Sequence, residues 1–401
     1  MWEQIRSNEM RSVFIIAFMG ALLLAVGYII GVYFLDSPIT GIAIAGVVWI
    51  IMNITAYFQG DSILLSVAGA RKIKKEDHPR LFNVVEEMAI ASGLSRMPDV
   101  YIIDDPALNA FATGRDPEHA SVAITSGLLQ KLNRDELQGV IAHEIGHVNN
   151  RDILLMSISA VLMGSIIIIA YYASRMIFYS GGGRSRRSSS DGGGGGAIIL
   201  IIGIVFLILA PIFAQLMYFA LSRRREYLAD ASSALYTRYP EGLASALEKL
   251  GASTTQVKTA NQATAPMYIV NPFRQEGRAA ADLTSTHPPI SERIRVLRAM
   301  GGASYRDYEQ AFEKVKHQRV LGAATIAATA GAIGLRTPSS EGAVGEPDQS
   351  QRTRETQDTL WRMNNYKSFK CFNCGTLLRI PPAYNNPLVR CPHCGATNQV
   401  P

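Results

Sequence analysis

The chain has 401 residues, a formal net charge of +6, and a composition in which 48% of the residues are hydrophobic. Long apolar runs take up a good part of this length, so the chain is not a simple globular domain and leaves room for one or two soluble units. The positive charge is compatible with nucleic-acid binding, but basic residues crowd the ends of the apolar runs, which is typical of membrane topology, and we therefore disfavour a nucleic-acid partner.

The first two apolar runs predict a transmembrane hairpin. Residues 13–34 contain no charged side chain, residues 40–57 repeat this pattern, and each run is long enough to cross the hydrocarbon core of a bilayer. The short connection at residues 36–38 leaves room only for a tight turn. A cleaved signal peptide is disfavoured, because no small-residue cleavage pattern follows the first run. We place this hairpin in residues 1–60.

A segment with ordinary globular patterning follows the hairpin. Apolar residues at helical spacing predict a helix over residues 79–92, and β-rich runs at residues 100–103 and 121–125 predict strands. Asn133 offers an N-cap, with Glu136 three residues later, so a helix with an apolar stripe is predicted to begin here.

Two further apolar runs, residues 153–179 and 197–221, predict a second pair of transmembrane helices. The Gly-, Ser- and Arg-rich residues between them have no capacity to pack a core and predict a flexible loop. We interpret the shorter run at residues 320–335 as a buried or interfacial segment rather than a fifth span, although a crossing of the bilayer stays open. Residues 336–366 have few large apolar side chains and predict a flexible linker.

Basic residues at the ends of the runs predict the orientation. A basic cluster at residues 71–75 follows the second run, and arginines 223–225 follow the fourth. Because positive residues mark the cytoplasmic side, four spans place both termini and the soluble regions on the cytoplasmic face of the cell's inner membrane. The arginines within residues 184–187 argue against this orientation, but they lie farther from the span ends.

His143, Glu144 and His147 form the pattern His-Glu-x-x-His within a predicted helix. Positions four residues apart share one face of a helix, so both imidazoles can reach one tetrahedral zinc ion. Glu144 is then placed to take a proton from water at the metal. A solvated surface helix is the alternative explanation of this pattern.

Glu226 is the candidate third ligand, because catalytic zinc takes three protein ligands and keeps one position open. It lies four residues before Asp230, which could accept a hydrogen bond from a ligating imidazole. A charged helix face that pairs with arginines 223–225 is the alternative.

The cysteines all lie near the C-terminal end, as Cys371, Cys374, Cys391 and Cys394. Both pairs have Cys-x-x-Cys spacing, with 16 residues between them, which is typical of a zinc ribbon with a closed four-thiolate site. We place this ribbon in residues 367–401. Because no cysteine remains elsewhere, a disulfide framework is excluded and a reducing compartment is favoured.

Taken together, these motifs resemble those of the HtpX-type membrane zinc metalloproteases, which are related to the CAAX prenyl proteases. The matching segments, in family order, are residues 109–114, residues 143–147 extended by Asn150, Arg151 and Asp152, residues 222–230, and residues 285–293. The usual family core has no counterpart of the loop at residues 181–196 or of the tail after residue 335.

The resemblance implies a role for each matching residue in the metal site. Glu144 would be the general base, and the catalytic zinc would be bound by His143, His147 and Glu226. The residues that would support these ligands are Asp230 and Asn150.

The resemblance also implies where substrate binds. Asn109, Ala110 and Phe111 match the active-site edge to which an extended substrate could add as a β-strand, although an ordinary turn and strand in a core explains these residues equally well. His287 precedes two prolines, and we expect it to approach the substrate oxyanion; a purely structural histidine at a helix start is the alternative.

We therefore predict an α-helical integral membrane protein with four transmembrane helices, a mainly α, minor β zincin-type metalloprotease domain at residues 61–335, and a small C-terminal zinc ribbon. Two zinc ions are expected, one catalytic and one structural in the ribbon. The predicted function is cleavage of membrane-associated or misfolded proteins, a quality-control role that the resemblance supplies. A CAAX-type processing protease and a non-catalytic membrane scaffold are the alternatives. Protein substrates and the lipid bilayer are the predicted partners, and the partner of the ribbon is unassigned.

Overall fold

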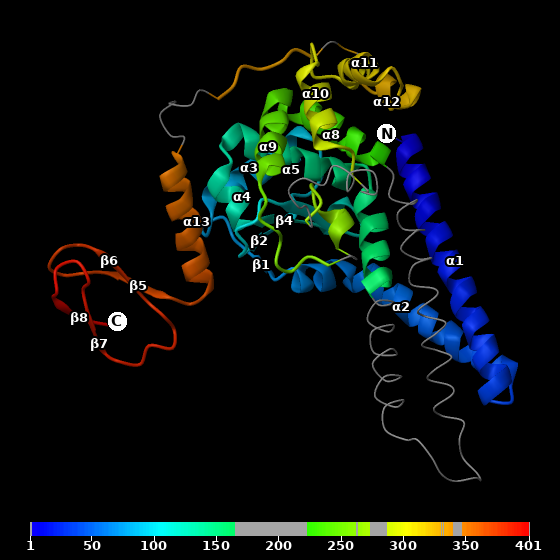
Figure 1. The fold of residues 1–401 in the computed structure, drawn as a ribbon, viewed down its shortest axis with the longest axis horizontal. Coiled ribbons are helices and arrows are strands. Elements are labelled where there is room, and N and C mark those ends of the chain that lie inside the picture. The colour runs from blue at the N-terminus through cyan, green and yellow to red at the C-terminus, as the bar shows by residue number, and fades with distance from the viewer. Residues whose placement is uncertain are drawn as a thin grey trace, which may run out of the picture.

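The computed structural model describes residues 2–164, 223–261, 264–272, 287–329, 331, 333–339 and 347–400. A helical hairpin lies at one end of the molecule, a mixed α/β domain forms the centre, and a small module of short strands lies at the other end (Figure 1).

The N-terminal hairpin consists of α1 (Trp2–Phe34) and α2 (Pro38–Val67), which confirms the predicted pair of helices. Ser37 caps α2 by accepting a hydrogen bond from the Thr40 N–H. The two helices pack closely, since a Cβ on Gly41 would lie 2.0 Å from the carbonyl oxygen of Gly27. Within the described ranges, α2 is the one helix that is long and apolar enough to span a membrane.

The predicted boundary at residue 60 falls inside α2. The last turns of this helix carry Leu64 and Leu65 into the main hydrophobic core of the central domain. The hairpin and the domain are therefore joined by a continuous helix, which a boundary drawn from hydropathy alone does not reveal.

A four-stranded sheet in the order β1-β2-β4-β3 forms the middle of the central domain. Its strands are β1 (Ala70–Lys72), β2 (Asp99–Ile103), β3 (Ala110–Gly114) and β4 (Ala120–Thr125). β2 and β4 run parallel, whereas β1 and β3 are antiparallel to their neighbours. The two predicted strands are confirmed as β2 and β4, and β3 forms one edge of the sheet.

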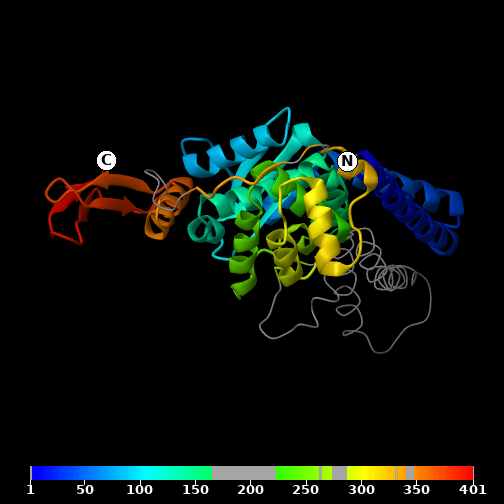
Figure 2. The ribbon, with the colours of Figure 1, turned by 90° about the horizontal axis from the view of Figure 1, so that it is seen from above.

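The helices of the central domain pack around this sheet and on one another (Figure 2). They are α3 (Pro79–Ala91), α4 (Ser126–Lys131), α5 (Arg134–Asn149), α8 (Arg223–Thr237), α9 (Pro240–Ala252), α10 (Ile290–Arg298) and α11 (Tyr305–Lys316), with 3₁₀ turns at Pro117–His119 and Ala265–Met267. The predicted helix at residues 79–92 is confirmed as α3. α5 lies against β3 and β4 and is covered by α8 and α9. α9 approaches closely, because a Cβ on Gly139 would lie 2.5 Å from the backbone nitrogen of Leu243.

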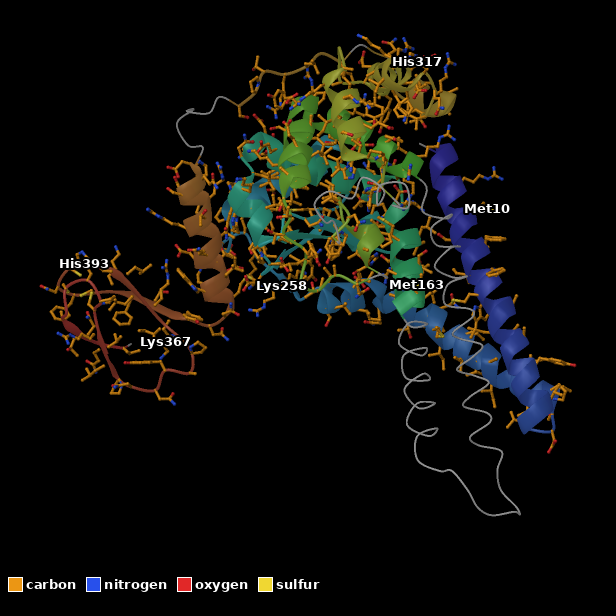
Figure 3. All side chains as sticks on the ribbon, viewed as in Figure 1. Met10, Met163, Lys258, His317, Lys367 and His393 are labelled. Carbon is orange, nitrogen blue, oxygen red and sulfur yellow. The ribbon has the colours of Figure 1, made fainter. Side chains whose placement is uncertain are left out.

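The second predicted hairpin lies mostly outside the described residues. The helix Asp152–Gly164 is the described beginning of the run predicted at residues 153–179. Its side chains Ile158 and Leu162 pack with Met19 of α1 and Ala56 of α2, and Figure 3 labels Met163 near its end. The rest of this run, the glycine-rich loop and the run at residues 197–221 lie outside the described residues.

The apolar segment at residues 320–335 forms only a short helix, α12 (Ala323–Ala327). Val320 and Leu321 before it are buried in the main core. Five helical residues cannot span a bilayer. Thr325 is also buried, whereas Ala323, Ala324, Ala327, Ala328 and Leu335 are exposed, so the described part of the segment is buried only in part, and the interpretation as a buried or interfacial segment stays a prediction.

The prediction of a flexible linker over residues 336–366 is wrong for α13 (Gln349–Met363). Asp348 caps this helix by accepting a hydrogen bond from the Gln351 N–H. Thr356 and Thr359 are buried where α13 packs on the domain, and α4 is its neighbour. Composition indicated disorder because only two large apolar side chains of α13, Leu360 and Met363, pack against the main core, and small polar side chains form the rest of the contact.

The C-terminal module, residues 367–400, consists of two antiparallel hairpins. The first pairs β5 (Lys367–Lys370) with β6 (Leu377–Ile380), and the second pairs β7 (Leu388–Arg390) with β8 (Thr397–Gln399). The module is attached to α13, because Arg379 pairs with Asp358 and stacks on the ring of Trp361.

Candidate active site

Helix α5 brings together the residues of the His-Glu-x-x-His motif. Its N-terminus has the predicted capping box, in which Asn133 and Glu136 each accept a backbone hydrogen bond from the other. His143 and His147 lie one turn apart on a buried face, and their Nε2 atoms are 3.3 Å apart. His143 is 0% exposed and Glu144 is 1% exposed. A solvated surface helix is therefore excluded.

Glu226 of α8 faces both imidazoles. Its Oε2 lies 3.6 Å from Nε2 of His143, and its Oε1 lies 3.7 Å from Nε2 of His147. α8 can approach α5 because Gly146 has no side chain: a Cβ there would lie 3.3 Å from the Cα of Ala229. The three candidate donor atoms all lie within 4.8 Å of one another.

This donor set fits a zinc ion. Two imidazole nitrogens and one carboxylate oxygen are ligands that catalytic zinc takes. Both oxygens of Glu144 are buried and have no hydrogen-bond partner in the described part of the chain. A bound water molecule could supply the donor that this buried carboxylate needs. Buried carboxylates also accumulate here, as Glu226, Asp230 and Asp152 join Glu144. A divalent cation would offset this negative charge.

Asp230 and Asp152 hold the two imidazoles from the side opposite Glu226. Oδ1 of Asp230 lies 3.0 Å from Nδ1 of His143, and Oδ2 of Asp152 lies 3.0 Å from Nδ1 of His147. When each carboxylate accepts the Nδ1–H, the Nε2 lone pairs are left to face Glu226. Asp230 thus makes the contact that the sequence predicted for it.

Asp152, rather than Asn150, contacts His147. Arg151 has a φ of 55°, a left-handed conformation that ends α5 and brings Asp152 back toward the helix. Asn150 is buried at the C-cap of α5, and its role as a supporting residue stays a prediction. Residue spacing did not reveal Asp152, because its reach depends on a left-handed turn at a residue other than glycine.

Arg293 of α10 completes the network, and sequence reasoning assigned it no role. It is fully buried and donates hydrogen bonds from Nε to Oδ2 of Asp230 at 2.8 Å and from Nη2 to Oδ1 at 2.6 Å. Its Nη1 donates to the carbonyl oxygen of Ile269 at 3.2 Å and lies 3.9 Å from Oε2 of Glu226. Arg293 is the last residue of the matching segment at residues 285–293, so the sequence offered a reason to consider it. The sequence does not show, however, that α10 crosses α8 and brings Arg293 to Asp230.

The buried carboxylates favour positive charge at this site. Burial alone lowers the pKa of His143, but hydrogen bonds with Asp230 and Glu226 outweigh burial and raise this pKa to about 9. Burial also raises the pKa of Glu144. For Glu226, burial works in the same direction, yet the charge of His287 and a hydrogen bond with His143 hold its pKa well below the ordinary value. Glu226 is therefore an anion at neutral pH.

His287 enters the site just before α10. Its Nδ1 lies 3.3 Å from Oε2 of Glu226, so it borders the candidate ligands. The structure thus brings His287 to the site, and its role toward a substrate oxyanion stays a prediction.

The outer edge of β3 is occupied where a substrate strand was predicted. The side chain of Asn109 donates to the carbonyl oxygen of Val270 at 3.0 Å and accepts from the Val270 N–H at 3.4 Å. The carbonyl oxygen of Ala110 accepts from the Ile269 N–H at 3.0 Å. The substrate-binding role of Asn109, Ala110 and Phe111 stays a prediction, and in this structure the chain itself covers these groups.

A second cluster of candidate metal ligands lies in the C-terminal module and consists of Cys371, Cys374, Cys391 and Cys394. The Sγ atoms of Cys371 and Cys394 are 3.7 Å apart, as are those of Cys374 and Cys391. Gly375 and Gly395 have φ values of 71° and 75°, which permit the tight turn of each Cys-x-x-Cys pair. Four sulfur donors around one point fit a tetrahedral zinc ion.

Comparison with known proteins identifies several similar chains. The family model described as "Peptidase family M48" matches residues 75–301. A protein of Dictyoglomus turgidum described as "Protease HtpX homolog" is 47% identical over 300 residues, which cover 75% of this chain and 95% of the relative. The protein of the same description from Streptococcus pyogenes serotype M28 is 42% identical over 300 residues, 75% of this chain and 100% of the relative. Among solved structures, S. mikatae Ste24p matches with a TM-score of 0.40 and 20% identity, over 74% of this chain and 67% of that chain.

Proposed function

Because this chain belongs to peptidase family M48 and is a metalloprotease, we propose that it is an integral membrane zinc endopeptidase that cleaves membrane-associated or misfolded proteins. The observation that carries this proposal is the buried triangle of His143, His147 and Glu226, with the unpartnered carboxylate of Glu144 beside it. Quality control of membrane proteins is the role that we assign to this activity.

Each residue of the site has a separate task. A zinc ion bound by His143, His147 and Glu226 would polarise the peptide carbonyl and lower the pKa of bound water. Glu144 accepts a proton from the attacking water at its carboxylate and delivers a proton to the amine of the departing product. Because burial raises the pKa of Glu144, this carboxylate is better matched to proton transfer near neutral pH.

The supporting residues keep the ligands in place. Asp230 and Asp152 hold the two imidazoles in the tautomer that leaves Nε2 free to bind metal. Arg293 in turn holds Asp230 with two hydrogen bonds, so that the carboxylate keeps one orientation. We assign His287 to the substrate oxyanion and Asn109, Ala110 and Phe111 to the substrate main chain.

We further propose four transmembrane helices, with the active site and the C-terminal module in the cytoplasm. The lipid-facing character of α2 supports a membrane location, since it exposes the large apolar side chains Ile39, Ile44, Val47, Ile50, Ile51 and Ile54. An exposed apolar stripe of this length is unfavourable in water and favourable in lipid. The C-terminal module is assigned as a zinc ribbon with a second, structural zinc ion.

The substitution Glu144→Gln tests the proposed chemistry. The variant should retain the zinc content of the parent and lose proteolysis of an unfolded membrane-protein substrate, because glutamine cannot accept the proton. A variant that cleaves as fast as the parent would show that Glu144 is not the base. Loss of activity with retained zinc also excludes a scaffold that only uses zinc for stability.

Metal analysis and a cleavage screen complete the test. The parent should hold two zinc ions per chain, and replacing the four cysteines by serine should leave one. A screen of unfolded membrane proteins should yield many cleavage sites, whereas a single permitted site would favour a processing protease.

A further inference from the structure

The C-terminal module is uniformly basic. Residues 367–400 contain Lys367, Lys370, Arg379 and Arg390 and no acidic residue. Arg379 is engaged by Asp358 and Trp361 of α13, Arg390 donates a hydrogen bond to the carbonyl oxygen of Gly395, and the side chains of Lys367, Lys370 and Arg390 are exposed. A zinc ion bound by the four thiolates would carry two negative charges in total, which the four basic side chains exceed, so the module keeps a net positive charge and favours an anionic partner.

The same module exposes large apolar side chains. Phe372 at the first Cys-x-x-Cys turn is 77% exposed, and Leu388 at the start of β7 is 50% exposed. Leu377 and Tyr384 are also exposed. Leu377 pairs across the hairpin with Lys370, so apolar and cationic groups lie side by side. Exposed apolar side chains among basic ones are typical of surfaces that rest on anionic membranes.

The attachment of α13 places the module near the membrane end of the domain. Thr359 and Arg362 donate hydrogen bonds to the carbonyl oxygen of Asp77, and Arg71 donates to that of Met363. These partners belong to the segment that follows α2 directly. In Figure 1 the module lies at the level of β1 and α2, below the helices α10 to α12, and Figure 3 labels Lys367 and His393 within it. The module thus lies at the level of α2, at the end of the domain opposite the hairpin, and away from α10 to α12 (Figure 1 and Figure 2).

We propose that the C-terminal module docks on the anionic surface of the bilayer that anchors the protein. Lys367, Lys370 and Arg390 contact acidic headgroups, while Phe372 and Leu388 enter the interface. This inference rests on the proposed membrane location. A bilayer fits better than a nucleic acid or an acidic protein, because charge, exposed apolar groups and a position at the level of α2 (Figure 1) all match it.

Hydrogen exchange of the full chain in nanodiscs tests this proposal. Amides of residues 367–372 and 384–390 should exchange more slowly in discs that contain phosphatidylglycerol than in discs of phosphatidylcholine alone. The double substitution Lys370→Gln and Arg390→Gln should weaken docking by about 25-fold, since each cation near an anionic surface contributes about fivefold. Lys314→Gln, an exposed cation of α11, is the matched control and should leave the protection intact.

The outcomes separate this inference from the membrane proposal. A chain that does not enter nanodiscs contradicts the membrane location, and the docking inference falls with it. A chain that enters them but exchanges equally fast in both lipids overturns the docking inference alone. Protection by added RNA or by an acidic peptide, without protection by phosphatidylglycerol, also overturns it.

A second, independent observation concerns residues 268–270, which cover β3. Two backbone N–H groups and one carbonyl group of this segment bond to Asn109 and Ala110, as described above. The ring of Tyr268 packs edge-on against the ring of Phe111, with centroids 5.3 Å apart. An extended peptide that adds to β3 needs the Ala110 carbonyl oxygen as an acceptor.

We infer that the segment of residues 268–270 blocks substrate binding at β3 until it is displaced. This inference rests on the proposed substrate role of β3. The segment occupies the Ala110 carbonyl oxygen and the Asn109 side chain, which are assigned to substrate, and the carbonyl oxygen of Ile269 accepts a hydrogen bond from Arg293 beside the candidate metal ligands. Peptide binding and closure of this segment are therefore mutually exclusive.

The substitution Ile269→Pro tests the block, because it removes the N–H that bonds to Ala110. Tyr268 has φ −72° and ψ 148°, a conformation that a residue before proline adopts readily. The variant should cleave a short unstructured peptide with a kcat/KM about two- to tenfold higher, mainly through a lower KM. Ile269→Val keeps the N–H and should behave like the parent.

A folded, zinc-containing Ile269→Pro variant that is slower than both the parent and Ile269→Val overturns the block. A second measurement avoids the risk of misfolding. When peptide is added to Glu144→Gln, the amide of Ile269 should exchange faster, and an unchanged rate overturns the inference. If neither the parent nor any variant cleaves peptide, the proposed function fails and the block fails with it.

Discussion

Replacing Arg293 by lysine tests whether a buried guanidinium positions the metal ligands. Arg293 makes two hydrogen bonds to Asp230 and one to the carbonyl oxygen of Ile269. A lysine ammonium keeps the charge but cannot form the planar fork, so at least one charge-assisted hydrogen bond is lost. Such a bond contributes about 1.5–3 kcal/mol. Because Asp230 orients His143, we expect zinc affinity to fall about 10- to 100-fold.

Zinc affinity is measured by competition with a chelator, and kcat/KM is measured at saturating zinc. Arg295→Lys, at an exposed position of the same helix, is the matched control and should change neither quantity by more than about twofold. If Arg293→Lys binds zinc as tightly as the parent and cleaves as fast, the fork does not position Asp230. The assignment of Arg293 to the site would then be wrong.

Two further predictions concern stability. Burial, assisted by the charge of Arg80, lowers the pKa of His78 from 6.5 to about 4. Between pH 6.5 and about pH 4, His78 binds a proton in the unfolded chain but not in the folded chain. The free energy of unfolding therefore falls by up to about 3 kcal/mol as the pH is lowered through this range, and above about pH 6.5 this contribution is fully present. His78→Asn keeps an acceptor for the Leu81 N–H and should make the free energy of unfolding, measured by denaturant titration, less dependent on pH in this range. An equal pH dependence in both proteins contradicts the reasoning. Gly139→Ala should lower the unfolding free energy by about 1–3 kcal/mol, because its Cβ would lie 2.5 Å from the Leu243 nitrogen, whereas Gly60→Ala, with 3.7 Å to the nearest atom, should be nearly neutral in the same assay.

The elements predicted correctly are those whose signals are local. The helix at residues 79–92 and the capping box of α5 depend on side chains within one or two turns, so sequence patterns reveal them. β1 escaped notice because it consists of Ala-Arg-Lys and is a strand only through its pairing with β2. α13 escaped notice because its contacts with α4 and with the segment after α2 involve threonine and arginine, which composition associates with linkers.

The sequence likewise revealed some residues of the candidate site and missed the contacts of others. His143, Glu144 and His147 could be predicted because helical spacing alone puts the two imidazoles on one face. Glu226 and Asp230 could be proposed because they lie four residues apart just beyond an apolar run. Arg293 and Asp152 could not be given their partners, since one depends on how α10 crosses α8 and the other on a left-handed turn at Arg151. These are tertiary facts that no linear spacing encodes.

The segment before α13 links the C-terminal tail to α5, the helix that carries His143, Glu144 and His147. Arg336 donates hydrogen bonds to Oδ1 of Asp135 at 2.6 Å and to the side-chain oxygen of Gln138 at 2.8 Å, both in the first half of α5. Ser339 donates its backbone N–H to the other carboxylate oxygen of Asp135 at 2.8 Å. Because Asp135 is nearly buried, removal of these donors would leave its charge poorly compensated. The tail therefore contributes to the stability of α5, even though the family match ends at residue 301.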